Sequence, residues 1–184
     1  MSELFPPVRR VVTGEDAQGR AIFVEDALSP AVKVVPARPG YRVTNVWRTG
    51  ASPSAIQAPD SILEQQGVLP PARGTVVRVI DYPPEPTDAA EVQRMQAATF
   101  ASLFPDADHT LQPHDHPGMH KTDTIDYAIM LAGEITAILE GEETILRAGD
   151  ILIQRGTNHA WANRSGKPAR IAFVLIDAAR DAGE

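Results

Sequence analysis

Residues 114–134, HDHPGMHKTDTIDYAIMLAGE, and residues 138–163, ILEGEETILRAGDILIQRGTNHAWAN, decide the fold of this chain. Glycines at positions 133, 141, 149, 156 and 166 fall seven to ten residues apart, and short apolar or alternating segments fill the gaps. Short strands separated by turn residues at this spacing are typical of an all-β sandwich or barrel. We expect strands at about residues 122–132, 135–139, 144–146, 151–154, 159–163 and 169–177.

The first of these segments carries polar residues along one side. Alternate residues of a strand share a face, so His120, Thr122, Thr124 and Asp126 should line one side of it. Such a row is too polar for a sealed core unless a metal ion, a polar ligand or water satisfies it.

A later strand repeats this arrangement, with His159, Trp161 and Asn163 on one face. A barrel can bring two distant strands together across its interior. His120, Asp126 and His159 would then form a set of two histidines and one carboxylate, which leaves positions open for substrate or oxygen. A hydrogen-bonded polar interior without an ion is the alternative.

The spacing of these residues resembles the two motifs of the cupins, G(X)5HXH(X)3,4E(X)6G and G(X)5PXG(X)2H(X)3N. Asp126, six residues and Gly133 match the end of the first motif, with Asp in place of Glu. His120 falls on its first histidine and Thr122 on its second. Gly156, His159 and Asn163 match the second motif, and the similarity covers about residues 114–177.

The chain departs from the cupin pattern at several positions. Thr122 replaces a histidine, Gln154 stands where proline is usual, and Gly149 is one residue closer than the motif asks. A metal would therefore have fewer ligands than in most metal-dependent cupins, and its carboxylate would come from Asp, whose side chain is shorter than that of Glu. His114 and His116 form a literal HXH and are the alternative ligands.

The resemblance implies an all-β fold, a double-stranded β-helix (jelly-roll or cupin barrel), with a small-molecule pocket inside. It implies a metal-dependent enzyme of dioxygenase, isomerase, decarboxylase or lyase type, using iron, manganese, nickel or zinc at His120, Asp126 and His159. Thr122, Trp161 and Asn163 are the candidate substrate-binding residues; the alternatives are core packing for Trp161 and structural strand or turn roles for Thr122 and Asn163. Catalytic residues stay unassigned. The alternative is a non-catalytic small-molecule-binding cupin with a degenerate or empty metal site. Resemblance to paired cupin barrels also implies a homodimer formed through N-terminal strands.

The rest of the chain reads as part of one cupin domain spanning residues 1–184. N-terminal strands and a wrapping loop occupy 1–75, a strand and a helix occupy 76–105, and the motif core occupies 114–177. Turns are expected at residues 14–16 and 18–19, and strands at 21–25, 32–35, 41–47 and 75–82. A helix is predicted at about 88–103, because Asp88 and Glu91 form a start signature and apolar residues follow at helical spacing. It should pack on the sheet or, alternatively, form a lid over the barrel mouth.

Composition narrows the function classes. A net charge of −7 and a pI near 5.2 argue against nucleic-acid binding, which needs clustered Lys and Arg. The absence of cysteine excludes thiol nucleophiles and Cys-ligated zinc. The first residues lack the apolar core of a signal peptide, and no apolar run is long enough to cross a bilayer. We therefore expect a cytoplasmic protein with a small-molecule ligand and without nucleic-acid or membrane partners.

Overall fold

The strands of the second half of the chain form most of a barrel wall. The computed structural model describes residues 5–180. The strands are β6 (Thr124–Ala132), β7 (Glu134–Leu139), β8 (Glu143–Arg147), β9 (Ile151–Arg155), β10 (His159–Ala162) and β11 (Ala169–Asp177). Each predicted strand is confirmed within two residues at either end. Gly133, Gly149, Gly156 and Gly166 adopt positive φ between strands, which glycine does without a Cβ penalty.

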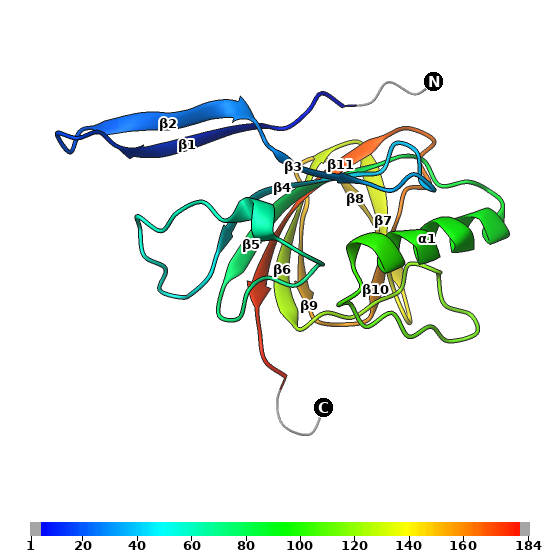
Figure 1. Cartoon of the computed structure of the whole chain (residues 1–184). Coiled ribbons are helices and arrows are strands. Elements are labelled where there is room, and N and C mark those ends of the chain that lie inside the picture. The colour runs from blue at the N-terminus through cyan, green and yellow to red at the C-terminus, as the bar shows by residue number, and fades with distance from the viewer. Residues whose placement is uncertain (1–4, 181–184) are drawn as a thin grey trace.

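Two antiparallel sheets enclose the interior of the barrel. The larger has the strand order β3-β4-β5-β11-β6-β9 and the smaller has the order β10-β7-β8. The sheets curve toward each other (Figure 1), and Trp161 of β10 meets Phe173 of β11 edge-on at 5.3 Å between ring centroids. The predicted all-β double-stranded β-helix is confirmed.

The N-terminal strands are β1 (Arg9–Glu15), β2 (Ala21–Leu28), β3 (Ala31–Val34), β4 (Arg42–Thr49) and β5 (Thr75–Tyr82). The last three extend the large sheet, whereas β1 and β2 form a hairpin that projects from the barrel (Figure 1). The turn expected at residues 14–16 is wrong, because Gly14 lies inside β1 and the turn follows at 16–20. A Cβ at Gly14 would lie 2.7 Å from Val24 Cγ1, so this valine of β2 fills the space that the glycine leaves.

Helix α1 (Ala89–Leu103) begins where its start signature predicts. The Asp88 carboxylate accepts the backbone N–H groups of Ala90 and Glu91, which lack partners within the helix. The helix lies beside the barrel (Figure 1). The predicted stripe of apolar residues and Thr99 is buried, together with one further side chain, Gln96; the stripe is Val92, Met95, Thr99, Phe100 and Leu103. The helix therefore packs on the barrel, which is the first of the two alternatives, packing on the sheet or forming a lid over the barrel mouth.

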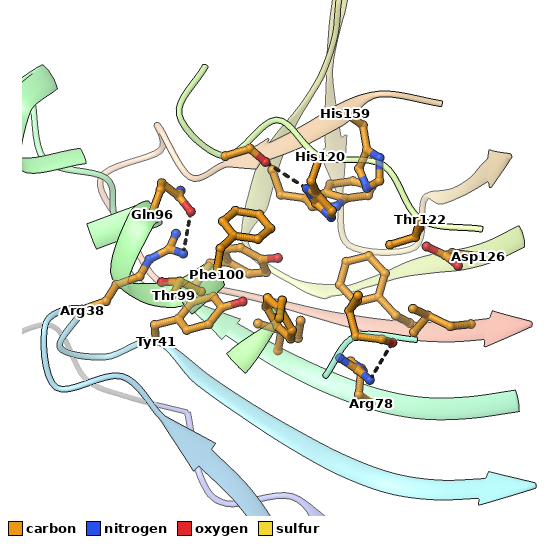
Figure 2. Close-up of a pocket in the computed structure, with 18 residues that line it drawn as sticks. Arg38, Tyr41, Arg78, Gln96, Thr99, Phe100, His120, Thr122, Asp126 and His159 are labelled. Atoms are coloured by element: carbon orange, nitrogen blue, oxygen red, sulfur yellow. Dashed lines mark hydrogen bonds between the residues drawn. The ribbon is translucent and has the colours of Figure 1, made fainter. Parts of the chain in front are cut away.

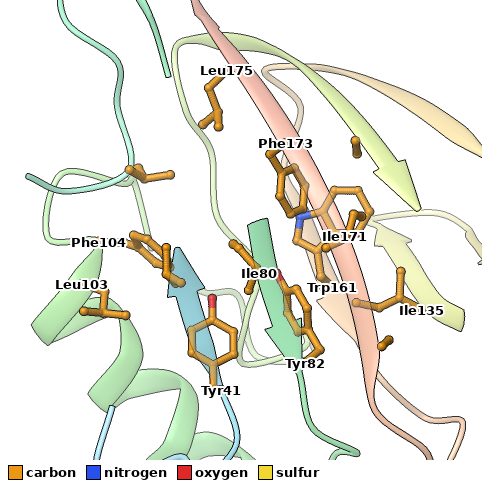
Figure 3. Close-up of a cluster of buried hydrophobic side chains, with 14 of the residues drawn as sticks. Tyr41, Ile80, Tyr82, Leu103, Phe104, Ile135, Trp161, Ile171, Phe173 and Leu175 are labelled. Carbon is orange, nitrogen blue, oxygen red and sulfur yellow. The ribbon is translucent and has the colours of Figure 1, made fainter. Parts of the chain in front are cut away.

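The long connection at residues 50–74 also packs on the barrel. It contains one turn of 3₁₀ helix, η1 (Ile62–Glu64), and Ile62 and Val68 join the buried core. Figure 3 shows that core, in which Tyr41 and Tyr82 meet edge-to-face at 5.3 Å. No helix among residues 5–180 is both long and apolar enough to cross a membrane.

Candidate functional site

Two histidines distant in the sequence face each other in the barrel. His120 and His159 form a backbone bridge in which each N–H donates to the other residue's carbonyl, at 2.9 and 3.0 Å. This bridge places their imidazoles side by side, with ring centroids 4.3 Å apart (Figure 2). The structure therefore brings both predicted histidines into one cavity.

Backbone carbonyls fix which ring nitrogens of these histidines are free. His120 Nδ1 lies 2.9 Å from the Gly118 oxygen, and His159 Nδ1 lies 2.9 Å from the Thr157 oxygen. Because a carbonyl only accepts, each Nδ1 carries the proton and each Nε2 keeps its lone pair. Burial lowers the pKa of His120 to about 4 and that of His159 to about 3, the latter also by repulsion from His120. Two neutral imidazoles thus present Nε2 lone pairs, the form that binds metal ions or accepts hydrogen bonds.

Asp126 lies on the wall of the same cavity and lacks a partner for one oxygen. Its side chain is 4% exposed, and Oδ1 accepts no hydrogen bond among the described residues. Burial raises the pKa of Asp126 to about 6, although Thr124 and the positive charge of Arg78 oppose the shift. The Thr124 hydroxyl is also within 2.8 Å of the Thr122 hydroxyl. A buried carboxyl group with a raised pKa is typical of functional sites.

The fit to a metal ion is partial. The two Nε2 atoms suit a divalent transition metal, but no group of three or more His, Asp or Glu side chains within residues 5–180 is arranged to hold one. Asp126 shares the cavity with the imidazoles without completing such a group. The structure thus brings His120 and His159 together, with Asp126 on the wall of the same cavity.

The alternative histidine ligands lie outside this pair. His114 is exposed, and His116 Nε2 lies 3.2 Å from Glu85 Oε1. His109 stacks on Phe100 at 3.8 Å between ring centroids. None of the three lines the cavity.

The cavity has a volume of about 50 Å³, and more residues line it than the sequence motifs indicate. Thr122 and Trp161 line it, as predicted, whereas Asn163 does not. The Asn163 amide instead donates to the backbone oxygens of Tyr82 and Lys167, at 3.0 and 2.7 Å, and so closes a turn. The substrate-binding role predicted for Asn163 therefore has no counterpart here.

Residues that the sequence motifs missed supply the opposite side of the cavity. They come from β5, α1 and the segments around them, and are Arg38, Tyr41, Val68, Arg78, Ile80, Tyr82, Gln96, Thr99, Phe100 and Phe104. One signal in the sequence could have indicated them: an arginine in the middle of the apolar strand TVVRVIDY. Arg78 shares a face with Ile80 and Tyr82, so strand parity alone turns its charge inward.

Comparison with known proteins agrees with this architecture. The Cupin_2 family model, described as a cupin domain, matches residues 107–176. The phomopsin biosynthesis cluster protein C' of Diaporthe leptostromiformis is 31% identical over 180 residues, covering 92% of this chain and 78% of that protein. The chain belongs to the cupin superfamily.

Two further similarities extend over most of the chain. The cupin-domain-containing oxidoreductase fogC of Aspergillus ruber is 25% identical over 178 residues, covering 92% of this chain and 72% of that protein. Among solved structures, a putative ethanolamine utilization protein from Salmonella typhimurium LT2 aligns with a TM-score of 0.43 and 10% identity. That alignment covers 95% of this chain and 100% of the other.

Proposed function

We propose that this chain is a small-molecule cupin enzyme that holds a divalent transition metal between His120 and His159. The observation that carries the proposal is the pair of imidazoles with ring centroids 4.3 Å apart and with both Nε2 atoms unprotonated. The relatives named cupin-domain-containing oxidoreductases support an oxidation or reduction as the reaction class. The substrate would occupy the cavity beside this pair.

Asp126 is the remaining candidate ligand, since it is the carboxyl group on the same cavity wall. Iron, manganese, nickel and zinc all suit imidazole and carboxylate donors. Bound there, such an ion would supply Lewis-acid chemistry or, if iron or manganese, redox chemistry. The Gly118 and Thr157 carbonyls would keep both rings oriented by holding their Nδ1 protons.

A non-catalytic small-molecule-binding cupin is the second candidate. The observation that favours it is the incomplete ligand group, because Asp126 does not join the imidazoles in a set of three. The neutral imidazoles and the buried carboxyl would then bind a polar ligand through hydrogen bonds alone.

Metal content and its loss in variants distinguish the two candidates. Protein purified without chelator should contain close to one equivalent of iron, manganese, nickel or zinc, measured by inductively coupled plasma mass spectrometry. His159→Ala should lose the metal, whereas His114→Ala, at an exposed position, should keep it. Less than about a tenth of an equivalent, unchanged in His159→Ala, would favour the binding protein. Asp126→Asn tests the third ligand, because a metal-bound carboxylate should lose affinity when it becomes an amide.

We also propose that the chain forms a homodimer through its N-terminal hairpin. Isolated two-stranded hairpins are marginal in water, and β1–β2 projects from the barrel with Phe23 74%, Val24 56% and Leu28 59% exposed. A second copy covering these side chains would remove them from water. Light scattering coupled to size-exclusion chromatography measures the mass that decides this.

A further inference from the structure

Two arginines line the cavity without a carboxylate partner among the described residues. Arg38 is 3% exposed and Arg78 is 1% exposed, and neither forms an ion pair. Elsewhere the chain neutralises its buried arginine: Arg10, 4% exposed, pairs with both Glu25 and Asp60. Leaving a buried charge without a counterion is costly, so two such residues on one cavity need an explanation.

Arg38 is positioned by neutral groups. Its Nη1 donates to Gln96 Oε1 at 3.2 Å, and its Cζ lies 4.2 Å from the centroid of the Tyr41 ring. Glu85 is linked to Arg38 through Gln96, whose Nε2 donates to Glu85 Oε1 at 3.4 Å. The Glu85 carboxylate also faces His116. The guanidinium is thus oriented beside the cavity with hydrogen-bonding capacity to spare (Figure 2).

Arg78 is held by backbone carbonyls. Its Nη2 donates to the Val68 oxygen at 3.0 Å and to the Gly67 oxygen at 3.4 Å, while Nε is buried with no partner among the described residues. Burial lowers the pKa of Arg78 to about 10, so the group stays charged at neutral pH. The carbonyls fix the side chain without neutralising it.

The charges of the cavity do not balance. Asp126 is the only carboxyl group among the residues that line the cavity, whereas Arg38 and Arg78 both line it. Outside this lining, Asp106 and Lys33 both act on the Arg78 charge, and they carry opposite signs. Two guanidinium groups against one carboxyl group therefore leave the lining net positive, in a chain whose net charge is −7. An anionic ligand would supply the missing negative charge.

We infer that the cavity binds a small organic carboxylate, with its charge neutralised by Arg38 and Arg78 and its apolar body packed against the aromatic lining. Guanidinium groups match the planar carboxylate with paired donors. Phe100, Phe104 and Phe173 supply apolar walls of the cavity. The ring centroids of Phe100 and His120 lie 5.0 Å apart, and Arg78 Cζ lies 5.7 Å from the centroid of the Phe104 ring. The inference rests on the proposed function and names the chemical class of its substrate.

Matched probes test the charge requirement directly. Isothermal titration calorimetry of the whole protein would compare benzoate with benzamide, which has the same shape without the charge, and with acetate, succinate and inorganic phosphate. We expect a carboxylate to bind and benzamide to bind at least about ten-fold more weakly. Equal binding of benzoate and benzamide, binding of phosphate alone, or no binding of any carboxylate at millimolar concentration would overturn the inference.

Variants then locate the anion. Arg38→Met and Arg78→Met should each reduce the preference for benzoate over benzamide, whereas Arg94→Met, on the exposed side of α1, should preserve it. A purely structural arginine would alter both affinities together and leave their ratio unchanged. An unchanged ratio in both folded variants would therefore refute the assignment. Chelator-treated protein should retain the benzoate preference, so loss of the metal and loss of the anion site are separate outcomes.

Discussion

Asp126→Asn should stabilise the metal-free protein at neutral pH. The buried Asp126 carboxyl titrates at a pKa of about 6 in the folded chain, against an ordinary value of 3.8. A folded-state pKa above the unfolded value means that the folded protein binds the extra proton between these two values, so its stability falls as pH rises through that window. A shift of about two units corresponds to roughly 3 kcal/mol, all of it lost above about pH 6.

The substitution removes this loss because an amide does not ionise. After allowance for an imperfect fit of the amide, we expect Asp126→Asn to gain roughly 1–3 kcal/mol at pH 7.5 and to differ little from the parent protein at pH 4. Trp47 and Trp161 provide the fluorescence signal for urea unfolding of chelator-treated protein across this pH range. The control is Glu142→Gln, an exposed carboxylate that should change stability by less than about 0.5 kcal/mol.

One result would refute this reasoning. If Asp126→Asn is less stable than the parent at pH 7.5, the carboxylate has a favourable partner in the folded protein. A retained metal ion would be such a partner, and metal analysis of the same sample identifies it. An unchanged pH slope between pH 4 and 6 would show instead that Asp126 titrates normally.

Three further predictions concern other parts of the molecule. The pKa values of His120 and His159 in the folded protein lie below the ordinary 6.5. The stability that these neutral side chains support is therefore present above pH 6.5 and lost as pH falls toward 4. His159→Gln should make this loss of stability at acid pH smaller, as measured by equilibrium unfolding. Asn163→Ala should lower stability by about 2–3 kcal/mol in urea, because two backbone carbonyls lose their donor, and Ser165→Ala should cost less. Phe23→Asp should convert the proposed dimer to a monomer in light scattering, while a mass unchanged from the parent would exclude the hairpin as the interface.

The sequence predicts the strands well where alternation and turn glycines agree. β5 and β11 match their expected ranges, because their apolar residues and flanking turn residues leave one assignment. β1 was not predicted because Gly14 looks like a turn residue in isolation, and only the close approach of Val24 on β2 explains why a glycine is needed within the strand. Such a pairing is a tertiary fact that local residue preferences do not contain.

Like the strands, the candidate site was predictable from the sequence only in part. Strand parity predicts that His120 and Asp126 face inward, and the second motif places His159 near them. The distance between the carboxyl group and the imidazoles depends on the backbone between Thr122 and Asp126, which a motif does not specify. Asn163 shares strand parity with His159, but it lies just beyond the end of β10, where its amide satisfies the turn.

The two halves of the chain contribute different chemistry to one cavity. Residues 107–176, which the cupin family model matches, supply His120, His159 and Asp126. Residues 38–104 supply Arg38 and Arg78 with most of the facing wall, and they lie outside that match. An isolated β-bridge between His120 and His159 holds the imidazoles in register with each other, whereas a helix and irregular segments position the arginines. Substitutions within residues 38–104 can therefore alter which ligand binds without disturbing the histidine pair. The substrate class should thus depend on the residues at positions 38, 78 and 96 more than on the cupin motifs.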